Sequence, residues 1–151
     1  MNGTSRGAAF EVAVTSGVAG APPTTRVRRL LSQAARATRT RPREVSVLFC
    51  GDARMRALNR RYRRRDRSTD VLAFPSEGPP GALLGDIVIS VPYASRQARR
   101  RREPVRKELD RLLVHGYLHL LGYNHETDDG QMDALEARLR RRFGIAERAS
   151  A

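Results

Sequence analysis

Apolar positions along the chain follow two periods, which predict an alternation of strands and helices. Apolar residues three and four apart predict helices that start near residues 24, 52, 92, 105 and 128. Alternating or β-branched apolar runs predict strands at 10–14, 45–50, 70–74 and 86–91. The order of these elements predicts an α+β fold, in which a mixed sheet of about four strands packs against helices.

Polar residues at the expected helix starts are candidates for N-caps. Thr24 or Thr25 precedes the first helical stripe, Asp52 the second, and Thr127 or Asp128 the last. Their side-chain oxygens are expected to accept hydrogen bonds from the first helical N–H groups. The arginines that share the second helix with its apolar stripe are expected to point outward.

Length and composition favour one cytoplasmic domain. The chain has 151 residues, and we expect 1–151 to be a single unit, with 1–9 disordered and 10–144 folded. The single cysteine, Cys50, cannot form an intramolecular disulfide, which favours a reducing compartment. Because no apolar run approaches the roughly 20 residues of a membrane helix, a cytoplasmic protein without a membrane partner is expected.

Positive charge is concentrated in two segments. The formal net charge is +13, and 28 of the 29 basic residues are arginines. Residues 52–67 contain eight arginines against two aspartates, and residues 96–107 contain six arginines and one lysine against one glutamate. Because the guanidinium group suits phosphate, this distribution favours binding of a polyanion such as nucleic acid. For either segment alone, a solvated helix face is an equally simple interpretation.

The three histidines of the chain, His115, His119 and His125, lie close together in the sequence. Residues four apart share one face of a helix, so His115 and His119 can present two nitrogens to one ion. Gly122 can take the left-handed conformation at the helix end and bring His125 back as a third ligand. Three imidazoles with an open fourth position are typical of a catalytic zinc site, although nickel and iron also accept imidazole.

The surroundings of the histidines favour a shared metal over separate core roles. A lone histidine on so apolar a helix is usually a hydrogen-bonded core residue, but several unpaired imidazoles there would each cost roughly a few kcal/mol. The spacing of i, i+4 and i+10 is also that of the metzincin proteases. Those enzymes need a glutamate directly after the first histidine as general base, and Gly116 stands there. The sequence therefore argues against a peptidase of that type.

Four segments taken together resemble the YbeY family of bacterial endoribonucleases and ribosomal RNA maturation factors. They are HGYLHLLGYNH at 115–125, LNRRYR at 58–63, STDVLAF at 68–74 and LGDIVIS at 84–90. The resemblance implies the family's α+β fold, similar to zincins, with a mixed sheet flanked by helices and a helix that carries the metal. It also implies that the three histidines hold the metal and that Arg63 is the functionally required arginine.

The chain departs from the usual family pattern at three positions. Asn124 replaces the aspartate before the third histidine, so a hydrogen-bonding role in holding an imidazole is expected to weaken. Ser68 replaces a proline that would stiffen a turn, and Ala73 replaces a serine. We therefore expect a lower metal affinity and a looser turn at Ser68.

The resemblance and the charge together predict metal-assisted cleavage of an RNA phosphodiester. Bound zinc, or another divalent metal such as nickel, acts as a Lewis acid or lowers the pKa of water towards about 7. Arg63 is expected to neutralise the extra charge of the transition state. Weaker contacts to the RNA backbone are expected from four neighbouring residues, Arg60, Arg61, Arg64 and Arg65.

Two groups of residues have more than one interpretation. The general base is open among metal-activated water, the RNA 2′-hydroxyl, Asp86 and Asp70, although turn or cap contacts are the simpler roles for both aspartates. Tyr62 and Tyr117 are able to stack on bases. Packing in the core is nevertheless the expected role of both tyrosines.

By resemblance, the expected substrate is single-stranded precursor 16S ribosomal RNA near its 3′ end, in ribosome assembly and quality control. The expected partners are the 30S or 70S ribosome, a small-subunit ribosomal protein and an assembly GTPase. Two other functions stay open: a ribosome-associated factor that binds RNA without cutting it, and a metalloprotease-like hydrolase. Metal-dependent cleavage of RNA, set against cleavage of casein, distinguishes the three.

Overall fold

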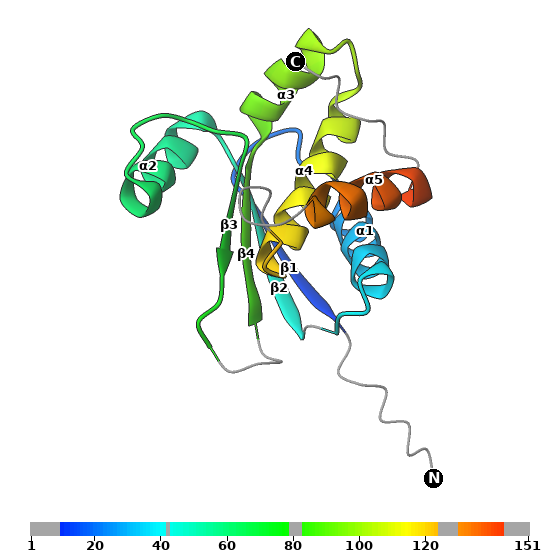
Figure 1. Cartoon of the computed structure of the whole chain (residues 1–151). Helices are drawn as coiled ribbons and strands as arrows, with labels where there is room; N and C mark the ends of the chain where they lie inside the picture. Colours follow the sequence, from blue (N-terminus) through cyan, green and yellow to red (C-terminus); the bar gives the residue numbers. More distant parts are fainter. Residues whose placement is uncertain (1–9, 42, 79–82, 124–129, 144–151) are drawn as a thin grey trace.

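The order of helices and strands agrees with the prediction from the sequence (Figure 1). The structure is a computed structural model that describes residues 10–41, 43–78, 83–123 and 130–143. Its elements are β1 (Glu11–Ser16), α1 (Thr24–Ala37), β2 (Glu44–Cys50), α2 (Asp52–Arg63), β3 (Val71–Pro75), β4 (Leu83–Ser90), α3 (Val91–Arg100), α4 (Val105–Leu120) and α5 (Gln131–Phe143). The expected disorder of 1–9 and the expected cap at Thr127 or Asp128 lie outside the described residues. None of the helices within these ranges combines the length and hydropathy needed to cross a membrane.

The strands form a mixed sheet in the spatial order β1-β2-β4-β3. β1, β2 and β4 are parallel, and the register places Val47 opposite Ile87. β3 pairs antiparallel with β4 and places Ala73 opposite Ile87 as well. The expectations of a mixed sheet of about four strands, and of direct pairing between its last two strands, are confirmed. In the described part of the chain β3 is an edge strand, so backbone groups on its outer side are available for contacts beyond the sheet.

Helices cover both faces of the sheet because successive strand residues point to opposite faces. Ile87 and Ile89 of β4 belong to the core shared with α1, α4 and α5. Val88 lies between them in sequence and packs with Met55 of α2 on the opposite face. Figure 1 shows this arrangement, with α1, α4 and α5 on one side of the sheet, α2 on the other, and α3 continuing from the end of β4.

Two of the expected N-caps are wrong. Pro23 and Gly51 occupy the N-cap positions of α1 and α2, so Thr24 and Asp52 are already the first helical residues. Neither helix has a side-chain cap, and the Asp52 carboxylate is engaged instead by side chains from other elements. α3 does have a side-chain cap, because Ser90 Oγ accepts a hydrogen bond of 3.3 Å from a backbone N–H of its first turn.

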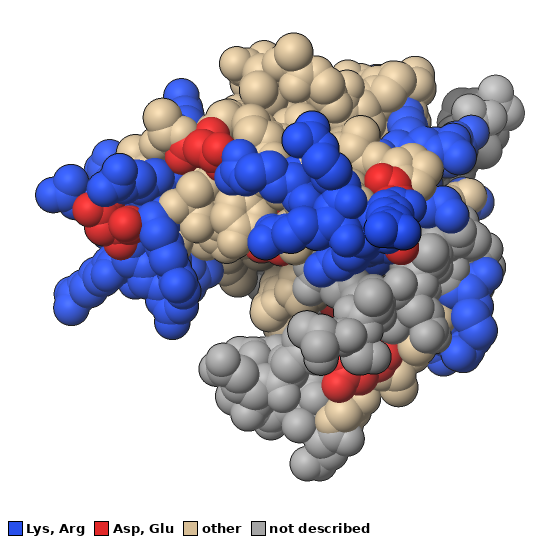
Figure 2. Space-filling model, turned by 90° about the horizontal axis from the view of Figure 1, so that it is seen from above, with Lys and Arg blue, Asp and Glu red and all other residues tan. Residues whose placement is uncertain are grey.

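In the view of Figure 2, basic side chains gather most densely where α2 lies and over α3, and further basic groups lie beyond these two areas. The arginines of α2 are exposed, as expected. The second basic segment is divided. Arg99, Arg100 and Arg102 are exposed, whereas Arg101 is half-buried and pairs with the buried Glu108 of α4. A uniformly solvated helix face is therefore only part of the explanation for this segment.

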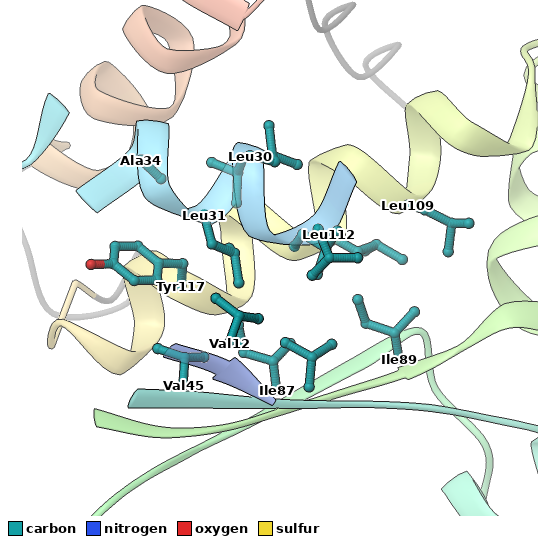
Figure 3. Close-up of a cluster of buried hydrophobic side chains, with 14 of the residues drawn as sticks. Val12, Leu30, Leu31, Ala34, Val45, Ile87, Ile89, Leu109, Leu112 and Tyr117 are labelled. Atoms are coloured by element: carbon teal, nitrogen blue, oxygen red, sulfur yellow. The ribbon is translucent and has the colours of Figure 1, made fainter. Parts of the chain in front are cut away.

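The largest core cluster lies between the sheet and the helices α1 and α4 (Figure 3). Leu31 of α1 and Leu112 of α4 are buried there above Val45 and Ile87. Tyr117 of α4 is fully buried, and its hydroxyl shares a 2.6 Å hydrogen bond with Thr40 Oγ1. The core position expected for Tyr117 is confirmed. Because close-packed side chains hold α4 against β4, this core also fixes where the histidines of α4 lie.

Candidate metal centre

His115 and His119 lie on consecutive turns of α4. Their Nε2 atoms are 2.9 Å apart, and their rings meet at 65° with centroids 4.5 Å apart. Both residues are half-buried, whereas their neighbours along α4 are buried. The helix therefore brings the two imidazoles together at its accessible side, as the four-residue spacing predicts. Their role as metal ligands stays a prediction.

Glu136 of α5 contacts the His115 ring on the side away from His119. Its Oε1 lies 2.6 Å from His115 Nδ1. When Nδ1 carries the proton and donates to this carboxylate, Nε2 keeps its lone pair for another partner. Metal-binding histidines almost always have such a partner on their second nitrogen. The sequence analysis did not identify Glu136. An acidic residue directly after Leu135, on the apolar side of the last helix, is a signal that could have identified it.

Gly122 ends α4 as the sequence predicts. Its φ of 94° is in the left-handed region, and the N–H of Tyr123 donates to the carbonyl of Leu118 at 3.1 Å. This pattern of hydrogen bonds reverses the chain after a helix. The residues that follow, which include Asn124 and the third expected ligand His125, lie outside the described residues.

The described part of the site fits a divalent metal ion. Two nitrogens bound at about 2.0–2.1 Å to one tetrahedral ion would lie roughly 3.3 Å apart, and the observed Nε2 separation is 2.9 Å. The Glu136 carboxylate holds one of these rings in the way expected for a ligand. Among the residues that the structure describes, no group of three His, Cys, Asp or Glu side chains is placed to hold a metal. Two of the three expected ligands are thus brought together.

A cavity of about 160 Å³ opens beside the histidine pair. The described residues that line it come from α2, β3 and α4, and they are Arg63, Val71, Leu72, Ala73, His115, Gly116 and His119. One water needs about 10–15 Å³ of such volume, so the cavity has room for several waters or for a phosphate-sized group. It places a guanidinium group and two imidazoles around one space.

Arg63 reaches this cavity along the outer edge of the sheet. Its Nη2 donates a 2.8 Å hydrogen bond to the Ala73 carbonyl, and its guanidinium carbon lies 5.2 Å from the centre of the Phe74 ring. The contact uses the backbone of residue 73, so alanine in place of the family's serine leaves this anchor intact. The guanidinium has five N–H donors, and this bond engages one of them, so the group can still bind a phosphate while it is held in place.

The four neighbouring arginines stay at the surface. None of them is among the described residues that line the cavity, and all are exposed: Arg60, Arg61, Arg64 and Arg65. Arg64 follows α2 with a left-handed φ of 57°. These four arginines lie in the last turn of α2 and directly after it, next in the sequence to Arg63, and together they are called the basic rim. Their contact with RNA stays a prediction.

The core position expected for Tyr62 is wrong, because 54% of the residue is exposed. The buried residues of α2 are Met55 and Asn59, which lie earlier in the helix. The last turn lies over the edge strand, where Phe74 is the ring partner of Tyr62 at 5.3 Å between centroids. No further strand lies beside an edge strand, so side chains that pack on it, such as Tyr62, can remain partly exposed to solvent. The apolar spacing of the helix does not reveal that its last turn packs on such a strand.

The two aspartates considered as general bases are not among the described residues that line the cavity. Asp86 precedes Ile87, which faces the core with α4, so the Asp86 side chain points to the opposite face of the sheet. Asp70 accepts hydrogen bonds from the backbone N–H of Val71 at 2.7 Å and from Gln97 Nε2 at 3.1 Å. The contact with Val71 is the local contact expected as its simpler role, whereas the contact with Gln97 joins the segment before β3 to α3. The general base stays unassigned.

Asp52 ties α2 to α3 and to the segment before β3. Its Oδ1 accepts hydrogen bonds from Ser68 Oγ at 2.8 Å and Ser90 Oγ at 3.1 Å, and both carboxylate oxygens bind Arg96. The hydrogen bonds from Arg96 are the main cause that lowers the pKa of Asp52 from 3.8 to about 2. Ser68, where the family usually has proline, therefore gains a side-chain anchor. The expectation of a looser turn at this position stays a prediction.

Gly116 lies between the two histidines and directly over β4. A Cβ atom at this position would come within 2.8 Å of Ile87 Cγ2, so the approach of α4 to the sheet depends on glycine. A glutamate here, as metzincin proteases require, would have to occupy the same space. The packing thus gives a physical reason for the glycine and strengthens the argument against a peptidase of that type.

The fold and the histidine pair define a class of α+β proteins in which a helix with two imidazoles packs on a mixed sheet beside its edge strand. Residues 21–144 match the model of the family described as Endoribonuclease YbeY. The chain belongs to the YbeY family, and the resemblance drawn from its motifs is confirmed.

Several curated relatives carry the name Endoribonuclease YbeY. That of Anaeromyxobacter sp. strain Fw109-5 is 54% identical over 106 residues, which cover 68% of this chain and 55% of the relative. That of Solibacter usitatus is 48% identical over 99 residues, which cover 66% of this chain and 65% of the relative. The chain therefore spans less than two thirds of the length of these relatives. The solution structure of TM1509 from Thermotoga maritima shares the fold, with a TM-score of 0.64 and 24% identity over 88% of this chain and 89% of that one.

Proposed function

We propose that this chain is a metal-dependent endoribonuclease that cleaves single-stranded ribosomal RNA. The observation that carries the proposal is the convergence of the His115 and His119 imidazoles and the Arg63 guanidinium on one cavity. Membership of a family described by endoribonuclease activity supports the same reaction. Zinc is the preferred metal because of the imidazole ligands, and nickel is the second choice.

His115, His119 and, by the family pattern, His125 would hold the metal. A bound divalent ion supplies Lewis-acid chemistry at a phosphate oxygen. Glu136 keeps the proton of His115 on Nδ1, so that Nε2 remains a ligand atom. The buried neighbours on α4 limit the motion of both rings, which keeps the ligand nitrogens directed at one point.

Arg63 is well placed among the described residues to stabilise charge that develops on the phosphate. Its hydrogen bond to the Ala73 carbonyl fixes the guanidinium before the substrate arrives. Donors fixed in advance stabilise a transition state without reorganisation, and loss of one typically costs about 100- to 1,000-fold in kcat. The basic rim of Arg60, Arg61, Arg64 and Arg65 would hold the RNA backbone without reading its sequence.

The family pattern extends the proposal to a biological substrate. We propose precursor 16S ribosomal RNA near its 3′ end as that substrate, in ribosome biogenesis and ribosome quality control in the cytoplasm. The corresponding partners are the 30S or 70S ribosome, a small-subunit ribosomal protein and an assembly GTPase. The strongly basic surface supports association with particles rich in RNA.

Cleavage of precursor ribosomal RNA by the purified chain, with and without EDTA, tests the proposed reaction. We expect cleavage that EDTA abolishes and zinc restores, and a loss of about 100- to 1,000-fold in kcat for Arg63→Ala. Arg54→Ala is the control, because Arg54 is exposed at the start of α2 and is not among the described lining residues. RNA that is bound but stays intact under all conditions would favour a ribosome-associated factor without catalytic activity.

The metal content of variants tests the ligand assignment independently of cleavage. We expect His119→Ala to lose bound metal, as measured by elemental analysis of the purified chain. Full occupancy in that variant would refute the assignment. Casein is expected to remain uncut, since Gly116 excludes the metzincin glutamate.

A further inference from the structure

Tyr62 is a large aromatic side chain that the fold leaves exposed next to the candidate site. Its exposed fraction is 54%, and Val105 is the other exposed large hydrophobic residue in the described ranges. Tyr62 is adjacent in sequence to Arg63, which lines the cavity. The position therefore combines exposed aromatic surface with a direct sequence neighbour that lines the proposed reaction site.

The Tyr62 ring belongs to a short row of alternating guanidinium and aromatic groups. The guanidinium carbon of Arg61 lies 5.2 Å from the centre of the Tyr62 ring. Tyr62 contacts Phe74 at 5.3 Å between centroids, and Arg63 lies 5.2 Å from the centre of Phe74. This aromatic row, formed by Arg61, Tyr62, Phe74 and Arg63, leads from the basic rim to the cavity.

We propose that Tyr62 is a stacking site for an unpaired base of the RNA strand whose phosphate binds at Arg63. The inference rests on the proposed function, which places an RNA strand in the cavity. Aromatic rings and arginine planes are the groups on which proteins stack unpaired bases, and every base offers a π-face to them. The contact with Phe74 holds the ring in place while leaving more than half of Tyr62 accessible.

This site gives a physical origin for a preference for single strands. In a duplex, each base is stacked between its neighbours and paired, so its face cannot reach Tyr62 without unpairing. The basic rim alone does not provide this preference, because phosphates are present in both forms of RNA. Tyr62 is thus the described group beside the cavity that distinguishes an unpaired base from a paired one.

A purely structural role for Tyr62 makes a different prediction. If the ring serves only to cover Phe74, its removal lowers the free energy of unfolding and leaves the affinity for single-stranded RNA unchanged. If it stacks on a base, the affinity falls while folding is little affected, because the side chain is exposed. Stability by urea unfolding is therefore measured beside affinity for every variant.

Tryptophan fluorescence provides a direct test, because the chain contains no tryptophan. The Tyr62→Trp variant of the 151-residue chain is mixed rapidly with single-stranded oligo(U), with the same strand in a duplex with oligo(A), and with an abasic strand of equal length. We expect quenching by the single strand and none by the other two. Tyr93→Trp is the matched control, because Tyr93 on α3 also has a guanidinium, that of Arg96, 5.3 Å from its ring centre.

Affinities of further variants for labelled oligo(U), measured by fluorescence anisotropy, test the contribution of the ring. We expect Tyr62→Ala to weaken binding about 5- to 150-fold, and Tyr62→Phe to bind within about twofold of the unmodified chain, because stacking uses the ring and not the hydroxyl. Unchanged binding by Tyr62→Ala, or equal quenching of Trp at position 62 by the abasic strand, would overturn the proposal.

The outcomes separate this inference from the proposed function. Quenching at position 62 by single-stranded RNA that is never cut would support the stacking site and reject the nuclease. Normal metal-dependent cleavage, with no quenching and no loss of affinity in Tyr62→Ala, would reject the stacking site and leave the nuclease standing. A complete lack of RNA binding would overturn both.

Discussion

At the scale of single residues, the candidate site consists of reactive groups held by contacts that carry no chemistry of their own. His115 is held by the carboxylate of Glu136, and Arg63 by the backbone carbonyl of Ala73. Such a contact determines which ring nitrogen of a histidine carries the proton, or in which direction the N–H groups of an arginine point. The strength of metal and phosphate binding is therefore expected to depend on residues outside the reacting set.

Removal of the Glu136 carboxylate is expected to weaken metal binding. Glu136→Ala should lower the affinity for Zn²⁺ about 10- to 100-fold, the usual effect of losing such a partner. Glu136→Gln keeps an acceptor oxygen without the charge, so its affinity for Zn²⁺ should lie between that of Glu136→Ala and that of the unmodified chain. Isothermal titration of the metal-free chain with Zn²⁺ measures the effect, with Glu77→Gln, an exposed glutamate, as the control. An unchanged affinity in Glu136→Ala would contradict an orienting role.

The close approach at Gly116 leads to a prediction about stability. Gly116→Ala should lower the free energy of unfolding by about 1–3 kcal/mol, because the added Cβ lies 2.8 Å from Ile87 Cγ2. In an Ile87→Ala background the same substitution should cost less, since the opposing methyl group is gone. Urea unfolding of the four proteins measures this coupling, and Gly17→Ala, whose Cβ would meet nothing within 4 Å, is the control. If Gly116→Ala lowers the free energy of unfolding equally with and without Ile87→Ala, the contact with Ile87 is not the cause of the loss.

At the residue scale, a contact could be predicted from the sequence when its two partners lie close together along the chain. The pairing of His115 and His119 and the reversal at Gly122 follow from helix geometry, and both could be predicted. The partner of His115 comes from α5 and the exposure of Tyr62 depends on the edge strand, so both require the tertiary arrangement. Helical spacing shows which residues share a face, but not what lies opposite that face.

At the scale of elements, strands and helices could be predicted because their apolar periods are clear. The order of elements, the mixed sheet and the direct pairing of β3 and β4 agree with the prediction. The N-caps at Thr24 and Asp52 do not, because a capping oxygen competes with other partners that sequence does not reveal. For Asp52 these partners are Ser68, Ser90 and Arg96, which join α2 to two other elements.

The junction at Asp52 is expected to weaken in acid. Its folded-state pKa of about 2 lies below the ordinary value of 3.8, so the ionised carboxylate stabilises the folded state. This contribution is fully present above about pH 4 and is lost as the pH falls through 2. Because the side chain is 38% exposed, solvent screening limits the loss to about 1 kcal/mol.

Urea unfolding between pH 5 and pH 2 tests this contribution by comparing the unmodified chain with Asp52→Asn. The two curves of unfolding free energy should converge as the pH falls, since the variant has no carboxylate to protonate at this position. Asp66→Asn is the control, because Asp66 also has a lowered pKa beside Arg56 but its side chain is more exposed, at 53%. Parallel curves for the chain and Asp52→Asn would show that the junction does not depend on ionisation.

At the scale of the whole molecule, the basic areas on α2 and on α3 differ in their relation to the cavity. The α2 face contains Arg63, which lines the cavity, and the basic rim around it. The α3 face has Arg99 and Arg100, which are not among the described lining residues of that cavity. Figure 2 shows the two basic areas with tan surface and an acidic group between them. A strand in the cavity would therefore meet the α2 face first and the α3 face only if it extends further.

This difference predicts how the salt dependence of RNA binding changes with RNA length. For single strands, the logarithm of the affinity falls with the logarithm of the salt concentration, with a slope of about 0.7 for each phosphate neutralised. Replacing Arg60 and Arg65 by glutamine should reduce this slope for short and long oligonucleotides alike, by about 0.7 for each lost contact. Replacing Arg99 and Arg100 should reduce it only for strands long enough to reach α3. Anisotropy titrations over a salt series measure the slopes, and an equal reduction by the α3 pair with the shortest strand would mean that bound RNA lies along α3.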